Sequence, residues 1–250
     1  MKRSTVVTLS ACVAVAASAT LGPLGATVLA HPAKRHGGVP VQIRIEGTGS
    51  TLLKETSLVA VARRIDPDGK PGDVCEGDTA AAALQEATHG HWTAGAYYSG
   101  LGYSVEGILS ETHAFNSPYF WSFWIDGHSS STGICGAKLK AGEHLLFFPQ
   151  CSKQSATECP QGLFEPAVLE LTGPRTAHAG QTISLSVHSL ANATGKSTPA
   201  AGVTVSAGGS SAKTDSGGHA KLRLARAGRY EVLANGPGAV RDELTVSVHG

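Results

Sequence analysis

The sequence is poor in charge and has almost no excess of either sign. Charged residues make up 16% of the chain, and 20 basic residues stand against 19 acidic ones, which gives a formal net charge of +1. Because no basic excess exists to follow a phosphate backbone, nucleic acid is excluded as an expected partner. Small and β-branched residues take the place of charge, and they favour short strands and turns over a helical bundle.

Long apolar runs are also scarce, and the longest lies near the N-terminus. Lys2 and Arg3 precede a long uncharged stretch, which is typical of a secretory signal, and small residues predict cleavage after Ala30. We expect 1–30 to be a signal peptide and 31–40 a flexible lead. The mature chain is then secreted or held at the cell surface, and it keeps no stable membrane span.

Cysteine is rare, with five in the chain. Cys12 ends a short box that resembles a lipoprotein cleavage site and would carry lipid, but the apolar stretch before it is shorter than a signal requires. The other four form an even set in an oxidising compartment, for which three pairings exist. Cys151 and Cys159 bound a short loop and are expected to pair, which leaves Cys75 with Cys135. Their spacing lacks the CxxC pattern of a zinc site.

The segment 41–150 has the pattern of a compact α+β domain with one helix. Apolar and polar residues alternate from Val41 to Glu46, which predicts a strand with one buried face. Asp78 or Thr79 can cap a helix over 80–87. Further strands are expected over 51–61, 96–98, 103–108, 119–125 and 144–148.

A change of character follows at 151–166, a linker that contains two of the cysteines. Beyond it, 167–250 shows apolar segments at regular spacing, separated by Gly, Pro and Asp turns, which is typical of an all-β Ig-like sandwich. Strands are expected over 168–171, 182–187, 203–206, 220–224, 230–234 and 244–248. The expected fold is therefore β-rich with two domains, an α+β domain followed by the sandwich.

The first domain resembles the transcobalamin C-terminal-like domain, an exported bacterial family largely without assigned function. The resemblance covers about 41–150 and implies a β-grasp-like fold. In vertebrate cobalamin carriers this domain forms a lid over the corrin, so the resemblance also implies capture of a corrinoid with a partner. The matching segments are Val41–Glu46, Asp78–Thr79, Trp121–Gly127, Gly133–Gly136 and Lys140–Glu143.

The second domain resembles a bacterial Ig-like or prealbumin-like sandwich. The resemblance lies in turn signatures and implies the fold alone. The matching segments are Ala179–Thr182, Thr214–Gly218 and Ala227–Tyr230.

Aromatic residues are few but concentrated, because 12 of the 14 lie between Trp92 and Phe148. In a strand that starts at Tyr119, alternate side chains face opposite sides, and both sides are apolar. One interpretation is a central strand inside a core. The other is an exposed surface or cleft for a ligand or partner. The candidate residues for such a site are Tyr97, Tyr98, Tyr103, Phe120 and Trp124.

Metal and catalytic patterns are incomplete. Asp66, Asp68 and Asp73 lie in a Pro- and Gly-rich loop but lack the spacing of a calcium loop, and His89 and His91 lack a third ligand. No GxSxG, HExxH or P-loop motif occurs. We expect no catalytic residue, no metal and no cofactor.

These observations together predict a non-enzymatic binding or surface-interaction protein. The aromatic-rich first domain is the expected recognition element, and the second is a spacer or a further contact module. The partner is an extracellular macromolecule or a small ligand. Capture of a small cofactor-like molecule such as a corrinoid is the alternative, and an uncharacterised hydrolase comes third.

Overall fold

The computed structural model describes residues 37–250 except 62, 154, 156, 161, 165, 192 and 193. The expected signal peptide, its cleavage site, Cys12 and most of the flexible lead lie outside the described residues. The described part belongs to one compact unit. None of its helices is long and apolar enough to cross a membrane.

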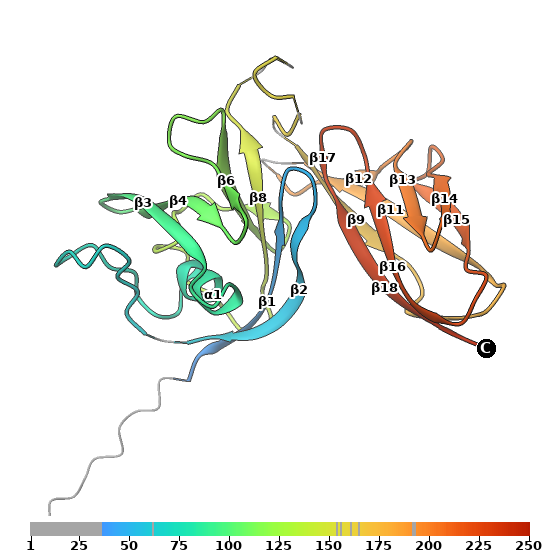
Figure 1. The fold of residues 1–250 in the computed structure, drawn as a ribbon, viewed down its shortest axis with the longest axis horizontal. Helices are drawn as coiled ribbons and strands as arrows, with labels where there is room; N and C mark the ends of the chain where they lie inside the picture. Colours follow the sequence, from blue (N-terminus) through green and yellow to red (C-terminus); the bar gives the residue numbers. More distant parts are fainter. Residues whose placement is uncertain are drawn as a thin grey trace, which may run out of the picture. The chain divides into compact units, whose positions relative to one another are not determined.

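The first domain is built on a mixed five-stranded sheet with the order β2-β1-β8-β6-β7. Strand β1 pairs antiparallel with β2 and parallel with β8, and the helix α1 packs on β1 and β2 (Figure 1). A hairpin, a helix and a last strand that returns parallel to the first define a β-grasp-like topology. The bounds are β1 Val39–Glu46, β2 Thr51–Ala60, α1 Ala80–Ala87, β6 Tyr119–Ile125, β7 His128–Ser129 and β8 His144–Cys151.

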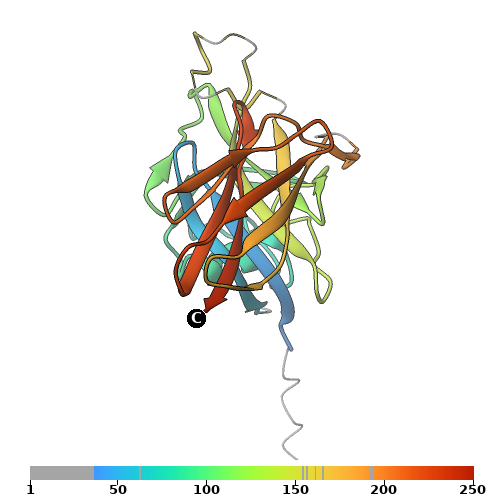
Figure 2. The same ribbon diagram turned by 90° about the vertical axis from the view of Figure 1, so that its right-hand side faces the viewer.

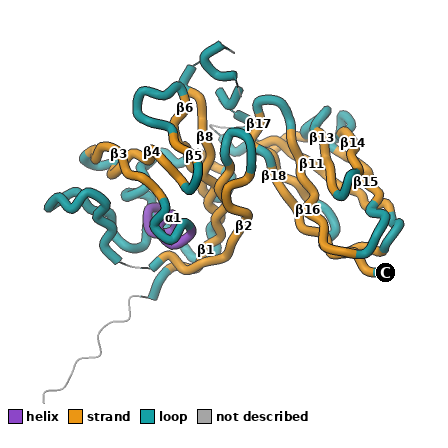
Figure 3. The backbone as a smooth tube through the Cα atoms, viewed as in Figure 1, coloured by secondary structure: helices purple, strands orange, loops and turns teal. Residues whose placement is uncertain are grey.

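A small antiparallel sheet completes this domain, with the order β3-β4-β5. Its bounds are β3 Trp92–Tyr98, β4 Gly102–Ile108 and β5 Glu111–Thr112. Apolar side chains of this sheet, of α1 and of one face of the larger sheet form a common core. Figure 3 shows the helix α1 in purple next to the strands of this domain.

The helix starts where the sequence predicts, but its first turn is satisfied differently. Thr79 is the N-cap residue, yet its hydroxyl donates to Glu76 O and accepts no amide of the helix. The amides of Ala80 and Ala81 donate instead to carbonyls of the turn that contains Cys135. Tertiary contacts therefore replace the side-chain cap, because the orphan amides of a helix start need some acceptor.

Both predicted disulfides are present, Cys75 with Cys135 and Cys151 with Cys159. The first ties the segment before α1 to the turn that accepts its first amides. The second closes a loop that follows β8.

The second domain consists of two facing sheets with the orders β10-β18-β16-β13-β14 and β12-β11-β9-β17, and β15 pairs with β11. In Figure 2 the strands of this domain face the viewer. Buried and exposed side chains alternate along these strands, and the buried ones fill the space between the sheets. This is the predicted all-β sandwich. The bounds are β9 Ala167–Thr172, β10 Thr176–His178, β11 Thr182–Leu190, β12 Ser197–Pro199, β13 Thr204–Ala207, β14 Ser210–Lys213, β15 His219–Arg223, β16 Gly228–Asn235, β17 Ala239–Val240 and β18 Asp242–His249.

A third apolar cluster joins the two domains. Trp124 of β6 and Phe148 of β8 lie on the face of the first sheet that points away from α1, and Val168 and Val240 come from β9 and β17. The strand from Tyr119 therefore has buried apolar side chains on both faces. One faces the core with α1, and the other faces the sandwich.

Candidate functional site

The structure divides the five aromatic residues predicted as a site. Tyr103 is buried, and its ring packs edge-on against Tyr97 with 5.0 Å between centroids. Trp124 is only 1% exposed, in the cluster between the domains. Tyr98 lies on the β3–β4 hairpin, and Phe120 lies near the start of β6 with 44% of its surface exposed. The five do not form one surface, and for Tyr103 and Trp124 the structure favours the core interpretation.

Tyr103 has a structural role that explains the aspartate-rich loop. Its hydroxyl donates to Asp68 Oδ1 at 2.7 Å and also to the carbonyl of Asp73. Burial, and then the bond to Asp68, raise the pKa of Tyr103 far above its usual value, so the phenol stays a donor. Asp66 accepts the amide of Gly69. No group of three or more potential metal ligands is found within the described ranges.

Three exposed phenylalanines lie on segments that are hydrogen-bonded to one another. Phe115 is 80% exposed in the turn before β6, Phe120 follows on β6, and Phe164 is 37% exposed beyond the second disulfide. We call these three residues the phenylalanine edge. Both views place the β5–β6 loop and the segment after β8 at the same end of the first domain (Figures 1 and 2).

Backbone contacts hold the segments of the phenylalanine edge together. The amide of Ser152 donates to Pro118 O at 2.8 Å, and the amide of Cys151 donates to Leu163 O at 2.8 Å. Only Phe120 belonged to the predicted site. Phe115 could have been found from its neighbours, because an aromatic residue just before an Asn-Ser-Pro turn has no local core to enter.

The turn that carries Phe115 is anchored by Glu111 and His113. Glu111 accepts the amide of Thr48 at 3.0 Å and lies 2.8 Å from His113 Nε2. The His113 ring also packs against Trp121 at 5.5 Å between centroids. The β5–β6 segment is thereby attached to the β1–β2 turn and to β6, which leaves the Phe115 side chain exposed on a fixed support.

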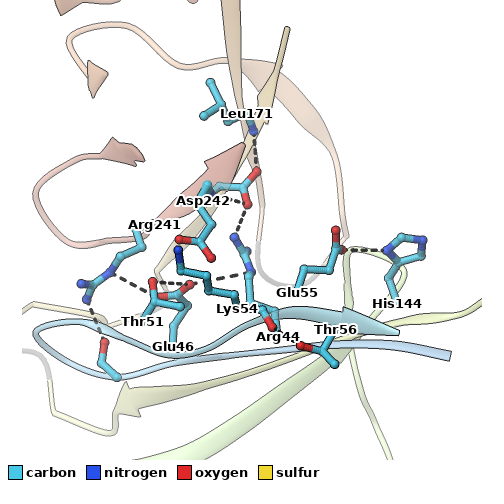
Figure 4. Close-up of polar contacts among 12 residues, drawn as sticks. Arg44, Glu46, Thr51, Lys54, Glu55, Thr56, His144, Leu171, Arg241 and Asp242 are labelled. Carbon is cyan, nitrogen blue, oxygen red and sulfur yellow. Dashed lines mark hydrogen bonds and ion pairs between the residues drawn. The ribbon is translucent and has the colours of Figure 1, made fainter. Parts of the chain in front are cut away.

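A buried charged cluster lies where β1 meets the start of β18, and the sequence pattern did not reveal it (Figure 4). Glu46 is 1% exposed, and its carboxylate lies 3.2 Å from Arg241 Nε and 3.8 Å from Arg44 Nε. Thr51 Oγ1 donates to the same carboxylate at 3.0 Å. Burial raises the pKa of Glu46 to about 7, against the lowering effect of Arg44, Arg241 and Thr51.

The same cluster connects sequence-distant strands. Arg44 forms an ion pair with Asp242, whose other oxygen accepts the amide of Leu171 at 2.6 Å. Arg241 Nη2 donates to the carbonyls of Gly47 at 2.9 Å and Thr48 at 3.2 Å. The expectation of one buried face on the first strand is therefore wrong at its end. Arg44 and Glu46 belong to the polar face, and the second domain covers them.

Three cavities lie away from the predicted aromatic site. One of about 250 Å³ is lined by Glu46, Phe148 and the loop before Arg241, and one of about 350 Å³ lies beside Arg63 and Trp92. A groove of about 660 Å³ runs between the β1–β2 and β13–β14 turns. Small-molecule pockets span about 300 to 1,000 Å³. The described residues that line these three cavities do not include any of the five predicted aromatics.

Ser186 and His219 are a serine and a histidine within hydrogen-bond distance, which is the first requirement of a nucleophile and its base. Ser186 Oγ lies 3.0 Å from His219 Nδ1 on the exposed face of two paired strands. Asp215 Oδ1 accepts the backbone amides of Gly217 and His219, each at 2.9 Å. A catalytic triad requires a carboxylate that is hydrogen-bonded to the imidazole. Here the Asp215 carboxylate accepts backbone amides of its own turn instead.

No family model matches the chain, and no curated protein matches it either. Among solved structures, the Arg-specific cysteine proteinase gingipain R aligns with a TM-score of 0.28 and 14% identity, over 42% of this chain and 22% of that one. A protein from Ruminococcus gnavus aligns with a TM-score of 0.31 and 12% identity, over 46% and 99%. The D0–D1 domain of intimin gives 0.26 and 16%, over 58% and 88%. The chain thus spans less than a quarter of gingipain R, and the fold assignment rests on the sheet topology.

Proposed function

We propose that this protein is an exported, non-enzymatic binding protein that recognises an extracellular macromolecule through the phenylalanine edge. The observation that carries the proposal is the 80% exposure of Phe115 on an anchored turn. Exposed Phe120 and Phe164 lie on segments that are connected by backbone hydrogen bonds to the strand following this turn. Exposed aromatic side chains on a rigid support are typical anchors of protein interfaces.

A macromolecular partner fits this edge better than a small ligand does. A small ligand needs a concave site that buries most of its surface. Phe115 projects from a turn, and none of the three phenylalanines lines the three cavities described above. A partner that supplies its own pocket can bury such side chains.

Export is supported by the cysteine chemistry. The four cysteines among the described residues are all paired in two disulfides, and disulfides persist in oxidising compartments. The expected signal over 1–30 agrees with this. In the proposal, the sandwich domain acts as a spacer or a second contact module.

The β-grasp-like topology also fits a transcobalamin C-terminal-like domain, as the resemblance of 41–150 implies. Capture of a corrinoid by that domain with a partner remains the competing proposal. Native mass spectrometry of the protein from its source separates the two, because a retained corrinoid would contradict the choice made here.

Phe115→Ala is expected to weaken binding to the partner by about 10-fold or more, because truncation of an aromatic anchor removes about 1.4 kcal/mol or more of interface energy. The partner is isolated from the protein's own extracellular environment by crosslinking to the full chain, and its affinity is then measured by titration. Stability should change little, since the side chain is exposed.

Val59→Ala is the matched control, because Val59 is also exposed and apolar but lies on β2. It should bind as the unsubstituted protein does. The proposal would be refuted if the alanine variants of Phe115, Phe120 and Phe164 each bound the partner as tightly as the unsubstituted protein does.

A further inference from the structure

The buried carboxylate of Glu46 is contacted from three directions. Arg44 precedes it on β1, and Thr51 faces it from β2. Arg241, the residue directly before β18, contacts it from the other domain. Arg241 belongs to the second domain, and its guanidinium also contacts the carbonyls of Gly47 and Thr48. Glu46 therefore lies at a contact between residues nearly 200 positions apart in the chain.

Further charged groups surround this contact on β2, β5, β16 and β18. Lys54 Nζ of β2 lies 3.5 Å from Glu231 of β16, and Asp242 of β18 pairs with Arg44. Glu243 of β18 opposes ionisation of Glu46, and Glu111 of β5 approaches the β1–β2 turn through the amide of Thr48. The acidic groups named here outnumber the basic ones, so a proton on Glu46 reduces the excess of negative charge at the junction.

We propose that Glu46 acts as a proton-sensitive latch, which takes up a proton when the β1–β2 hairpin packs against Arg241 and holds the two domains together more tightly in mildly acidic surroundings. This inference concerns the junction and is independent of the phenylalanine edge.

The contact persists when Glu46 is neutral, because Arg241 keeps other acceptors. Two backbone carbonyls still accept from its guanidinium, and Arg44 keeps the carboxylate of Asp242. A neutral carboxyl also still accepts from Thr51. The ionised form gains attraction to both arginines, but it loses its hydration in a site that is 1% exposed.

The direction of the effect follows from proton linkage. In the closed junction the pKa of Glu46 is about 7, and in an opened junction the carboxyl returns to its ordinary value of 4.5. Between these values the closed state holds a proton that the open state lacks, so closure is favoured fully below pH 4.5 and loses this advantage as pH rises through 7. The closing equilibrium should change on the order of 100-fold over this window.

The first test is a ¹³C nuclear magnetic resonance titration of the glutamate carboxyl carbons in the full chain, with Glu46 assigned from its loss in Glu46→Gln. A midpoint near 7 supports the latch, and a midpoint below 5 overturns it. Thr51→Val provides a second variant. Because the Thr51 hydroxyl lowers the pKa of Glu46, its removal should raise the midpoint, and an unchanged midpoint would contradict the geometry.

The second test is amide hydrogen exchange at Leu171, whose amide donates to Asp242 across from Arg44. After correction for intrinsic exchange, protection should fall on the order of 100-fold from pH 5 to pH 8 in the unsubstituted chain and stay constant in Glu46→Gln. Glu55→Gln is the matched control, because Glu55 is exposed on the same hairpin and pairs with His144. Protection of the Leu171 amide in Glu55→Gln should fall with pH as it does in the unsubstituted chain. If protection in Glu55→Gln were constant with pH, the pH dependence would not belong to Glu46 alone, and the latch would be contradicted.

Discussion

Replacing Trp124 with alanine is expected to lower the free energy of unfolding by about 3 to 5 kcal/mol. The indole is 1% exposed, and its ring lies against Phe148 with 6.0 Å between centroids. It fills the apolar cluster that β9 and β17 of the sandwich share with β6 and β8. Truncation leaves a cavity at the contact between the domains, and both domains lose packing. Urea denaturation followed by far-ultraviolet circular dichroism measures the loss.

Phe120→Ala is the matched control, because Phe120 lies on the same face of the same strand as Trp124 but is 44% exposed. Its substitution should cost less than about 1 kcal/mol, since little buried area is removed. Equal losses in the two variants would show that the sandwich does not cover this face as described.

Replacing Cys75 and Cys135 with serine is expected to cost about 4 kcal/mol of stability. The bridge closes a loop with a sequence separation of 60 residues, and long loops lose the most chain entropy when closed. Cys135 also lies in the turn whose carbonyls accept the first amides of α1. We therefore expect a weaker helix signal in circular dichroism as well as a lower denaturation midpoint.

The second disulfide provides the comparison within the same chain. Cys151 and Cys159 are 8 residues apart, so their replacement by serine should cost about 2.5 kcal/mol by the same loop entropy. That loop lies beside the phenylalanine edge and far from α1 in sequence. A larger loss for the short loop than for the long one would contradict the loop-entropy argument.

Local sequence patterns predicted the helices and strands whose apolar residues recur with a clear period or whose ends are marked by turn residues. The helix over 80–87 and the strands from Val41, Tyr119 and His144 lie where alternation, caps and turn residues indicated them. Strands of two or three residues, such as β5, β7, β10 and β17, are too short to show any period and were not predicted. Their pairing partners decide that they are strands.

The candidate site was only partly accessible to this reasoning. Concentration of aromatics between Trp92 and Phe148 directed the prediction of a site to the first domain. Alternation assigns a side chain to a face of the strand but does not say what covers that face. Phe120 and Trp124 share a face, and only the approach of β9 and β17 near one end of β6 separates the exposed ring from the buried one.

By itself, the sequence determined the composition-driven properties of this protein. A low and balanced charge, turn-forming residues at regular spacing and four cysteines with one short and one long separation specify a β-rich chain with two disulfides. The tertiary structure alone decided which polar residues are buried. Arg44 and Glu46 have the spacing of a solvent-facing row, yet the segment from Arg241 covers them, because contacts between residues so distant in the chain leave no trace in local periodicity.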